Sequence, residues 1–230
     1  HESLLAAAPL VGRSAELAQL HQLLGQAHRG HGSLLLLGGE SGVGKSRLME
    51  ELRVHALVQG VYAVRGQAIS EGGGAFSVWQ SILRALCLRG ELDELEASVL
   101  KVIVPDLERL LERPIADAPE LHAQAAQLRL MSVIESLLLR QRDPLLLLLE
   151  DVHWADAESL SLLRRVALAC QSRPLLILAS YRDDESPSLP QEFPGSPVMK
   201  LERLKTADIG ELCRAMVGPQ AATPELVSFL

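Results

Sequence analysis

The sequence predicts an α/β fold, with a mostly parallel five-stranded sheet between two layers of helices. Three apolar runs carry this prediction because they do not alternate with polar residues: Ser33–Leu37, Leu145–Leu149 and Leu175–Ala179. Strands without alternation are buried on both faces, as in a parallel sheet covered by helices. Stretches with helical periodicity separate the runs, as the crossovers of a parallel sheet require.

The other expected elements alternate between helix and strand. The longest separation lies between the second strand and the strand at 145–149, where we expect a helical insertion. In chain order the other elements are helices at Ser14–Ala27 and from Lys45 to Gly60, a strand at Val61–Val64, helices at Glu120–Arg142 and Ala157–Ala169, a strand at Val198–Leu201, and helices at Thr206–Met216 and from Thr223 onward.

Composition narrows the possible functions. Hydrophobic residues make up 48% of the 230 residues and charged residues 22%, the profile of a packed globular domain. The net charge is -7 and no run of Lys or Arg follows one face, so we expect no direct binding of nucleic acid. The apolar runs are shorter than the roughly 20 residues that cross a bilayer, which argues against a membrane segment. The widely spaced Cys87, Cys170 and Cys213 are typical of reduced thiols in a cytoplasmic protein.

A glycine-rich segment after the first strand matches the pattern G-x-x-x-x-G-K-[ST]. Its glycines let backbone N–H groups turn toward an anion, and the following helix adds the positive end of its dipole. Lys45 supplies a positive charge for the β- and γ-phosphates of ATP or ADP, and the Ser46 hydroxyl can bind Mg²⁺. We therefore predict a P-loop NTPase whose nucleotide-binding residues in this segment are Gly39, Glu40, Ser41, Gly42, Val43, Gly44, Lys45, Ser46 and Arg47.

Two acidic residues, Glu150 and Asp151, directly follow the most hydrophobic run. Ligands of open parallel sheets collect at the carboxyl ends of the strands, so these acids are expected beside the phosphates. Consecutive residues point to different sides, which lets one acid hold the metal and the other polarise water. The order is Glu then Asp, where Asp usually comes first in a Walker B motif. We assign Glu150 to the metal shell and Asp151 to the water, with Ser46, Glu150 and Asp151 as the candidate metal-site residues.

The ends of the sequence indicate a segment of a longer polypeptide, because it begins with His1 and ends at Leu230 in an apolar, helix-like stretch. We expect residues 1–10 to form a linker and residues 11–204 to form the P-loop NTPase core. Residues 205–230 are expected to begin a truncated helical lid.

Four motifs in order resemble one branch of the STAND NTPases, signal-transduction ATPases with numerous domains that are also called AAA-type ATPase modules. Besides the phosphate loop, Leu147–Asp156 reads LLLEDVHWAD and is similar to a signature of a hydrophobic run, two acids and His-Trp-Ala-Asp. Leu10–Leu17 reads LVGRSAEL and is similar to the opening motif of the family. Leu176–Arg182 reads LILASYR and is similar to a sensor strand that ends in Arg.

The resemblance implies a regulatory ATPase switch between an effector domain and a repeat-rich sensor. Effectors in the family include serine/threonine kinase domains, LuxR-type DNA-binding domains and nucleotide cyclases, and the segment from Gly72 to Trp79 most resembles the kinase-linked versions. The resemblance also implies that Val11, Gly12 and Arg13 lie by the adenine and that Arg182 senses the γ-phosphate. The expected partners are a nucleotide and covalently linked effector and sensor domains, with nucleotide-dependent self-association as a further possibility.

Two arginines also have simpler interpretations, which the sequence leaves open. Arg13 could cap a helix or pair with Glu16, and Arg182 could pair with Asp183 or Asp184.

The residues after the acidic pair have structural interpretations as well. Asp156 begins a helix and is expected to cap its N-terminus rather than to act in catalysis. Trp154 is expected to pack against the edge of the sheet. His153 could orient the acidic pair or a water molecule, or could make a structural hydrogen bond.

Three functions are compatible with these residues. The first is a slow ATPase that serves as a regulatory switch, with Lys45, Glu150, Asp151 and Arg182 as catalytic residues. The second is a nucleotide-binding scaffold that holds ADP without productive hydrolysis. The third is a small-molecule phosphotransferase, which needs an acceptor pocket at the end of the second strand that residues 65–71 supply poorly.

Overall fold

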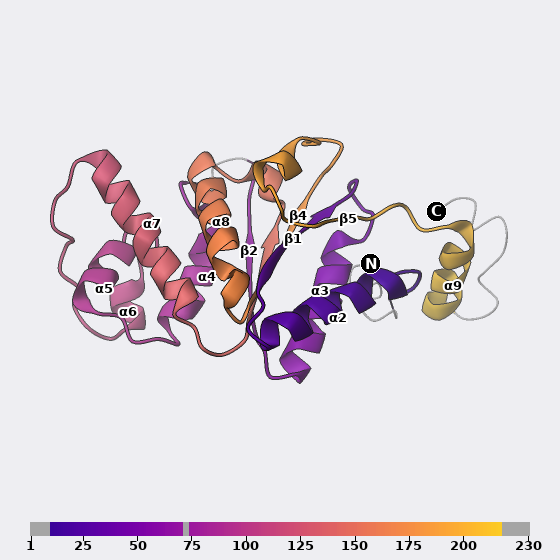
Figure 1. The fold of residues 1–230 in the computed structure, drawn as a ribbon, viewed down its shortest axis with the longest axis horizontal. Coiled ribbons are helices and arrows are strands. Elements are labelled where there is room, and N and C mark those ends of the chain that lie inside the picture. Colours follow the sequence, from indigo (N-terminus) through magenta and orange to yellow (C-terminus); the bar gives the residue numbers. More distant parts are fainter. Residues whose placement is uncertain (1–9, 71–73, 218–230) are drawn as a thin grey trace.

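The computed structural model describes residues 10–70 and 74–217 and has the predicted α/β architecture (Figure 1). Five parallel strands form one sheet in the order β2-β3-β4-β1-β5. The strands are β1 (Ser33–Gly38), β2 (Tyr62–Gln67), β3 (Leu145–Glu150), β4 (Leu175–Tyr181) and β5 (Val198–Lys200). The α-helices are α2 (Ser14–His28), α3 (Lys45–Val58), α4 (Ser77–Cys87), α5 (Glu94–Leu100), α6 (Leu107–Leu110), α7 (Ala123–Leu139), α8 (Ala157–Ala169) and α9 (Thr206–Val217).

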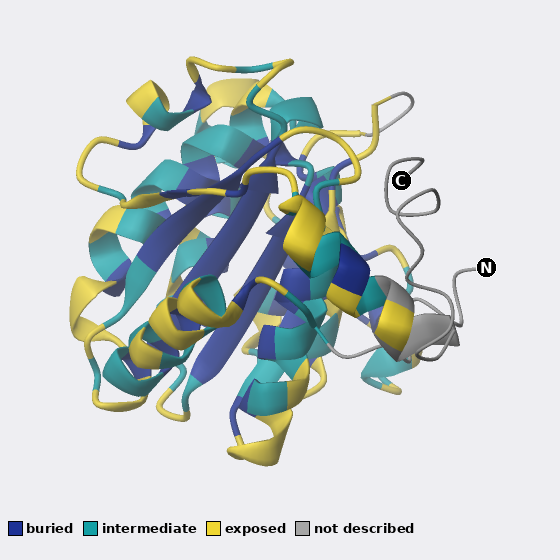
Figure 2. Cartoon of the chain, turned by 90° about the vertical axis from the view of Figure 1, so that its right-hand side faces the viewer, coloured by how far each residue is buried: buried dark blue, intermediate teal, exposed yellow. Residues whose placement is uncertain are grey.

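The sheet is buried on both faces, as the absence of alternation predicts. In β3, Leu145, Leu147 and Leu149 enter one hydrophobic core, whereas Leu146 and Leu148 enter the other. Helices α2 and α3 cover the second core, and α4, α7 and α8 cover the first (Figure 1). Figure 2 shows the central strands as a continuous buried layer between the two helical layers. The structure therefore confirms the three-layer α/β/α P-loop NTPase fold.

The helical insertion lies between β2 and β3, where the sequence places it, and contains α4 to α7. Its last helix begins at Ala123 rather than at Glu120, because the His122 side chain accepts a hydrogen bond from the Ala125 N–H and caps the helix there. The Trp79 indole of α4 donates to the Ser159 carbonyl of α8 at 3.2 Å. This bond joins the insertion to the helix that follows the acidic strand.

Strand β2 differs from the prediction. The sequence predicts Val61–Val64, but the strand runs from Tyr62 to Gln67 and pairs with β3 up to Glu150. Its C-terminal half is polar because β2 is an edge strand that exposes Arg65 and Gln67. The strand thus reaches the acidic end of β3, which the shorter prediction misses.

Parts of the expected organisation lie outside the described residues. These are residues 1–9 of the expected linker, residues 71–73 of the glycine-rich turn, and the helix expected from Thr223. Helix α9 agrees with the helix expected at Thr206–Met216 and lies at one end of the molecule in Figure 1. Within residues 10–70 and 74–217, no helix is both long and apolar enough to cross a membrane.

Two cysteines are placed as the sequence predicts. Cys87 and Cys170 are buried free thiols, and burial raises the pKa of each to about 11. Such thiols are largely unreactive at neutral pH.

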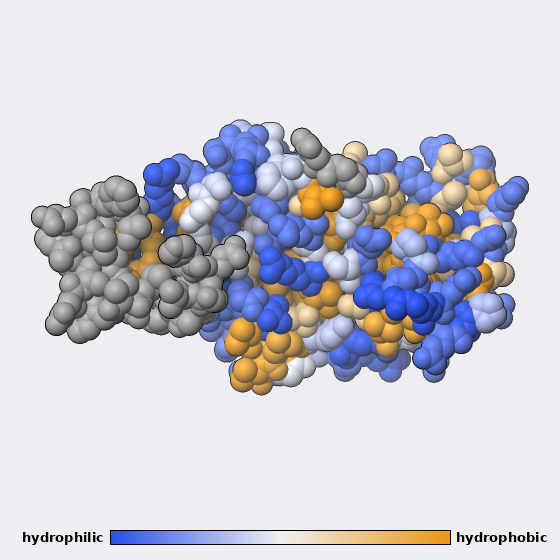
Figure 3. Space-filling view, turned by 180° about the vertical axis from the view of Figure 1, so that it is seen from behind, coloured by the Kyte–Doolittle hydropathy of each residue, from blue (hydrophilic) through white to orange (hydrophobic). Residues whose placement is uncertain are grey.

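The face of the molecule that is turned away from the viewer in Figure 1 is mostly hydrophilic, with a few apolar patches (Figure 3). One cluster of exposed apolar side chains lies at the C-terminal end of α3 and consists of Val54, Leu57 and Val58.

The close approach of β2 to α4 gives a test of the fold. A Cβ atom at Gly66 would lie 2.0 Å from the Val78 carbonyl oxygen, so Gly66→Ala must push the helix away from the sheet. We expect Gly66→Ala to lower the free energy of unfolding by about 1–3 kcal/mol in denaturant titrations.

Gly25→Ala is a matched control, because a Cβ at Gly25 in α2 meets nothing closer than the Arg29 side chain at 3.6 Å. This change should stabilise the helix by up to about 1 kcal/mol. Equal effects of the two substitutions would contradict the packing described here.

The contact between α2 and α3 gives a pH-dependent prediction. The rings of His21 and His55 stack with centroids 3.6 Å apart. Burial, and secondarily His55, lowers the pKa of His21 below its ordinary value of 6.5. The unfolded chain therefore binds more protons than the folded protein just below pH 6.5, and stability falls as the pH decreases from there toward the lowered pKa of the folded state.

Replacing His21 by Phe keeps an aromatic ring on His55 but removes this titration. We expect His21→Phe to reduce the loss of stability between pH 7 and pH 5.5, measured by denaturant unfolding. His31→Phe, at an exposed position, should leave the pH profile unchanged.

Candidate nucleotide site

The loop between β1 and α3 has the backbone of an anion site. Gly44 precedes the helix with φ of 102°, a left-handed conformation that favours glycine. Among the described residues, no side chain caps this helix, so its first N–H groups face the loop. Gly39 lies so close to the chain after β5 that a Cβ atom would be 2.7 Å from the Leu201 carbonyl oxygen. A Cβ atom at Gly42 or Gly44 would meet nothing within 4 Å, so the space beside these two glycines is open. An open loop at a helix N-terminus is a common binding site for phosphate groups.

Lys45 lies beneath this loop. Its Nζ donates to the carbonyl oxygens of Gly39 at 2.6 Å and Glu40 at 2.7 Å, and the residue is only 8% exposed. Burial lowers the pKa of Lys45, and the nearby charge of Asp151 opposes that shift. The amino group is thus held among the loop carbonyls, within the field of the acidic end of β3.

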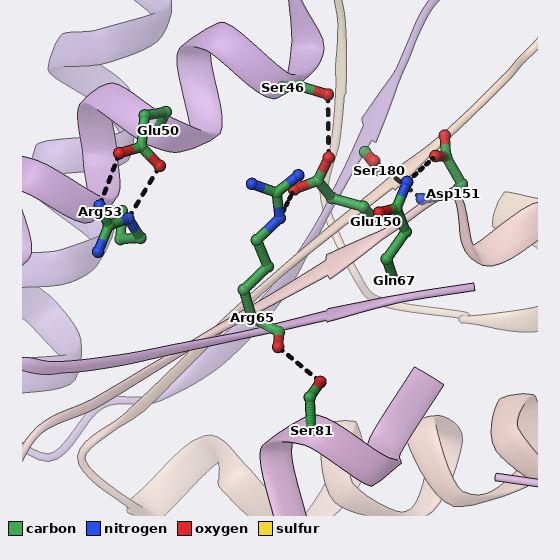
Figure 4. Close-up of polar contacts among 9 residues, drawn as sticks. All are labelled: Ser46, Glu50, Arg53, Arg65, Gln67, Ser81, Glu150, Asp151 and Ser180. Carbon is green, nitrogen blue, oxygen red and sulfur yellow. Dashed lines mark hydrogen bonds and ion pairs between the residues drawn. The ribbon is translucent and has the colours of Figure 1, made fainter. Parts of the chain in front are cut away.

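Ser46 and Glu150 meet across the boundary between α3 and β3. The Ser46 hydroxyl donates to Glu150 Oε2 at 2.9 Å (Figure 4). The other carboxylate oxygen of the buried Glu150 pairs with Arg65 of β2. A hydroxyl beside a carboxylate is the donor set that Mg²⁺ uses in nucleotide sites, where phosphates and water complete the shell.

No cluster of three or more His, Cys, Asp or Glu side chains suited to a metal occurs among the described residues. The pair of Ser46 and Glu150 fits Mg²⁺ held jointly with phosphates, since that ion binds through one or two protein groups. It does not fit a metal held by protein ligands alone.

Asp151 points to a different side from Glu150, as predicted for consecutive residues. Its backbone is left-handed, with φ of 55°, and its N–H donates to Ser180 Oγ at 3.2 Å. The carboxylate Oδ2 accepts from the Gln67 amide at 3.3 Å (Figure 4). Residues from β2 and β4 therefore orient Asp151, whereas Ser46 and Arg65 hold Glu150.

The Val11–Arg13 segment reaches the phosphate loop through the buried Arg13. The guanidinium donates to the Val43 carbonyl at 3.1 Å and to the Glu202 carbonyl, and it pairs with Glu16 at 3.0 Å. The pairing with Glu16 is thus present together with contacts to the loop. Gly12 approaches α9 so closely that a Cβ atom would lie 2.7 Å from Asp208 Cγ. The adenine-binding role of Val11, Gly12 and Arg13 stays a prediction.

Arg182 does not pair with either aspartate that follows it. It forms an ion pair with Glu185, and its guanidinium lies 4.9 Å from the centre of the Trp154 ring. Asp183 instead pairs with Lys200 at 2.8 Å. Arg182 still lies close enough to Lys45 to lower the pKa of that residue, after the larger effects of burial and Asp151.

The His-Trp-Ala-Asp segment packs beside Arg182. The His153 side chain is 1% exposed, and its Nε2 lies 3.4 Å from Glu185 Oε2. Neither ring nitrogen makes a hydrogen bond within the described part of the chain, and burial lowers the pKa of His153 despite the opposing charges of Asp151 and Glu185. The Trp154 indole donates to Glu185 at 3.3 Å. Asp156 caps α8 through the Ser159 N–H at 2.8 Å, which confirms its expected role.

Four residues of this site are absent from the sequence-based prediction: Arg65, Gln67, Ser180 and Glu185. Arg65 and Gln67 are exposed polar positions of β2 just beyond the predicted strand end at Val64, and a strand that continues to Gln67 indicates both. Ser180 lies within the sensor motif, and Glu185 is three residues beyond its arginine, at the spacing of a helical turn.

A phosphate loop after β1, a lysine beneath it and an acid-tipped β3 define the class as a P-loop NTPase. The chain belongs to the AAA ATPase domain family, which it matches over residues 9–178. It is accordingly a nucleotide-binding module, and family membership implies ATP, typically with Mg²⁺.

Solved structures share this fold at low sequence identity. Cdc6p of Pyrobaculum aerophilum is 17% identical with a TM-score of 0.57, over 94% of this chain and 53% of that protein. A chain of the HORMA:CdnC:Trip13 complex of E. coli MS115-1 is 14% identical with a TM-score of 0.51, over 99% of this chain and 74% of its own length.

A curated relative is an uncharacterized protein of Rhizobium meliloti, 26% identical over 198 residues. The match covers 76% of this chain but only 18% of that relative. The chain therefore spans less than a fifth of the length of this relative.

Proposed function

We propose that this module binds ATP with Mg²⁺ and hydrolyses it slowly, as a regulatory switch within a larger signalling protein. The observation that carries the proposal is the hydrogen bond of 2.9 Å between Ser46 and Glu150, beside the lysine of the phosphate loop. It brings a hydroxyl, a carboxylate and a cation to one end of the sheet, the set that phosphoryl transfer requires.

Each residue of the site has a role in this proposal. The loop from Gly39 to Arg47, which includes Lys45, holds the phosphates. Ser46 and Glu150 hold Mg²⁺, which when bound neutralises charge on the phosphates. Asp151, oriented by Gln67 and Ser180, positions the water that attacks the γ-phosphate.

Arg182 would sense the γ-phosphate only after leaving its ion pair with Glu185. This exchange gives the nucleotide a way to change the structure around the end of β4. A slow chemical step suits such a switch, because the two states must persist long enough to be detected.

The proposed role within a larger signalling protein rests on the STAND resemblance and on the length of the curated relative. The His-Trp-Ala-Asp segment and the LVGRSAEL motif are features of regulatory ATPases that are linked to kinases, transcription regulators or cyclases. A relative more than five times longer than the matched segment supports the view that such modules work within multidomain proteins. We propose the core at residues 11–204, a lid that begins at residue 205, self-association that depends on nucleotide, and a cytoplasmic location.

A second candidate is a scaffold that holds ADP without productive hydrolysis. The observation that favours it is the engagement of Arg182 by Glu185 and Trp154, which neutralises this charge within the protein. Single-turnover hydrolysis of bound ATP separates the two functions, because only the switch releases phosphate.

Removing the lysine tests nucleotide binding. We expect Lys45→Ala to weaken binding of MgATP about 10- to 100-fold, because a hydrogen-bonded charge contact with the phosphates is lost. Calorimetric titration measures this loss. Lys101→Ala is the control, since Lys101 pairs with Asp117 at 2.7 Å, within the helical insertion, and should leave affinity unchanged. Full ATP affinity and hydrolysis in Lys45→Ala would refute the proposed site.

Substitutions that remove the charge of Glu150 or of Asp151 should have different effects. We expect Glu150→Gln to raise the Mg²⁺ concentration needed for nucleotide binding by about 10- to 100-fold. Asp151→Asn should bind MgATP normally but slow phosphate release in single turnover by about 10²- to 10⁴-fold. Exchanged phenotypes would reverse the two roles, and unchanged phosphate release in both variants would exclude them from catalysis.

A further inference from the structure

Arg65 is the charged partner of the proposed metal-binding acid. Glu150 has two occupied oxygens: Oε2 accepts from the Ser46 hydroxyl at 2.9 Å, and Oε1 pairs with Arg65 Nε (Figure 4). The two side chains differ sharply in exposure, at 47% for Arg65 and 4% for Glu150. The acid is fixed in the interior, whereas the guanidinium reaches it from the solvent side.

A buried carboxylate needs a compensating positive charge. The hydroxyl of Ser46 offers a single hydrogen bond without a net charge, so it cannot replace the lost hydration of an ionised acid. Lys45 is directed to the carbonyls of Gly39 and Glu40 instead. Arg65 forms an ion pair with Glu150 and so supplies the compensating positive charge.

The backbone of Arg65 is held in the sheet, whereas its side chain lies at the solvent side of the ion pair. The Arg65 carbonyl accepts from Ser81 Oγ at 2.8 Å, and the next residue, Gly66, lies against α4. The side chain reaches the buried Glu150 from the solvent side and keeps nearly half of its area exposed. Moving the guanidinium therefore requires a change of rotamer without any change in the sheet.

A second carboxylate lies near the same guanidinium. Glu50 of α3 is bound by Arg53 through contacts of 2.7 and 2.8 Å, and this bond is the main reason that the pKa of Glu50 is lowered. The charge of Arg65 contributes to the same shift, so Glu50 is within its electrostatic reach.

We propose that Arg65 is the resident counter-ion of Glu150 and that Mg²⁺ arriving with the nucleotide displaces it from this carboxylate. The proposal rests on the function proposed above, since it assigns the metal to Ser46 and Glu150. Arg65 is a positioning residue: it holds the acid oriented toward Ser46, and it raises the Mg²⁺ concentration that the site requires. Two cations that share one carboxylate repel each other, so binding of the metal and pairing with Arg65 oppose each other.

The test measures Mg²⁺ dependence in binding rather than in turnover. Calorimetric or fluorescence titration of ADP over a range of Mg²⁺ concentrations, at constant ionic strength, gives the half-saturating concentration of Mg²⁺. We expect Arg65→Gln, which keeps a hydrogen-bond donor but removes the charge, to lower this concentration about tenfold. Arg65→Lys keeps the charge and should stay within about threefold of the unchanged protein.

Arg84→Gln is the matched control. Arg84 lies on α4, its side chain is 46% exposed, and it pairs with Asp106 in the helical insertion. The substitution changes the net charge equally and should leave the half-saturating Mg²⁺ concentration unchanged.

A thermal unfolding series without nucleotide or Mg²⁺ adds a second measurement. Arg65→Gln should unfold at a lower temperature than Arg84→Gln, because it leaves the buried Glu150 without its counter-ion. Saturating Mg²⁺ and ADP should reduce this difference, since the metal supplies the missing charge.

Three results would overturn the proposal. An unchanged half-saturating Mg²⁺ concentration in Arg65→Gln, with normal ADP binding, would make Arg65 a purely structural partner. An increased concentration would make it a support for the metal rather than a competitor. Absence of ADP binding in the unchanged protein would remove the proposed function and this role together, so the two failures are distinguishable.

Discussion

The buried carboxylate of Glu150 is the constraint on which the rest of the site depends. It joins three elements: its own strand β3, the phosphate-loop helix through Ser46, and the edge strand β2 through Arg65. A charge without hydration is tolerated only where such partners are present, so this one acid links the positions of α3, β2 and β3. The parallel register, in which Gln67 pairs with Glu150, brings the polar end of β2 to the same edge.

Local patterns in the sequence were sufficient to predict most of the fold. Each buried strand is a short apolar run, and the phosphate loop is a contiguous motif whose glycines and lysine have fixed spacing, so neither depends on distant residues. Asp156 was predicted as a helix cap for the same reason. Strand β2 was predicted too short because its end alternates between polar residues and Gly66, a pattern that resembles a loop until the register with β3 is known.

The partners of the acids could not be predicted, because they depend on packing between segments far apart in the chain. Gln67 and Ser180 reach Asp151 from the strands on either side of β3. For Arg182, the sequence leaves a pairing with Asp183 or Asp184 open, and the structure shows a different partner for a local reason. The Ser186 N–H donates to the Arg182 carbonyl at 2.9 Å, and this turn brings Glu185, rather than Asp183 or Asp184, alongside the arginine.

Arg13 has a mechanical consequence for the whole module. One guanidinium contacts the carbonyl of Val43 in the phosphate loop and that of Glu202 in the connection to α9. The segment that carries Arg13 also includes Gly12, which lies against Asp208 of α9. The N-terminal segment, the phosphate loop and the connection to α9 are thus held together by the contacts of Arg13. A displacement of the loop at Val43 would therefore act on a guanidinium that also holds the connection to α9.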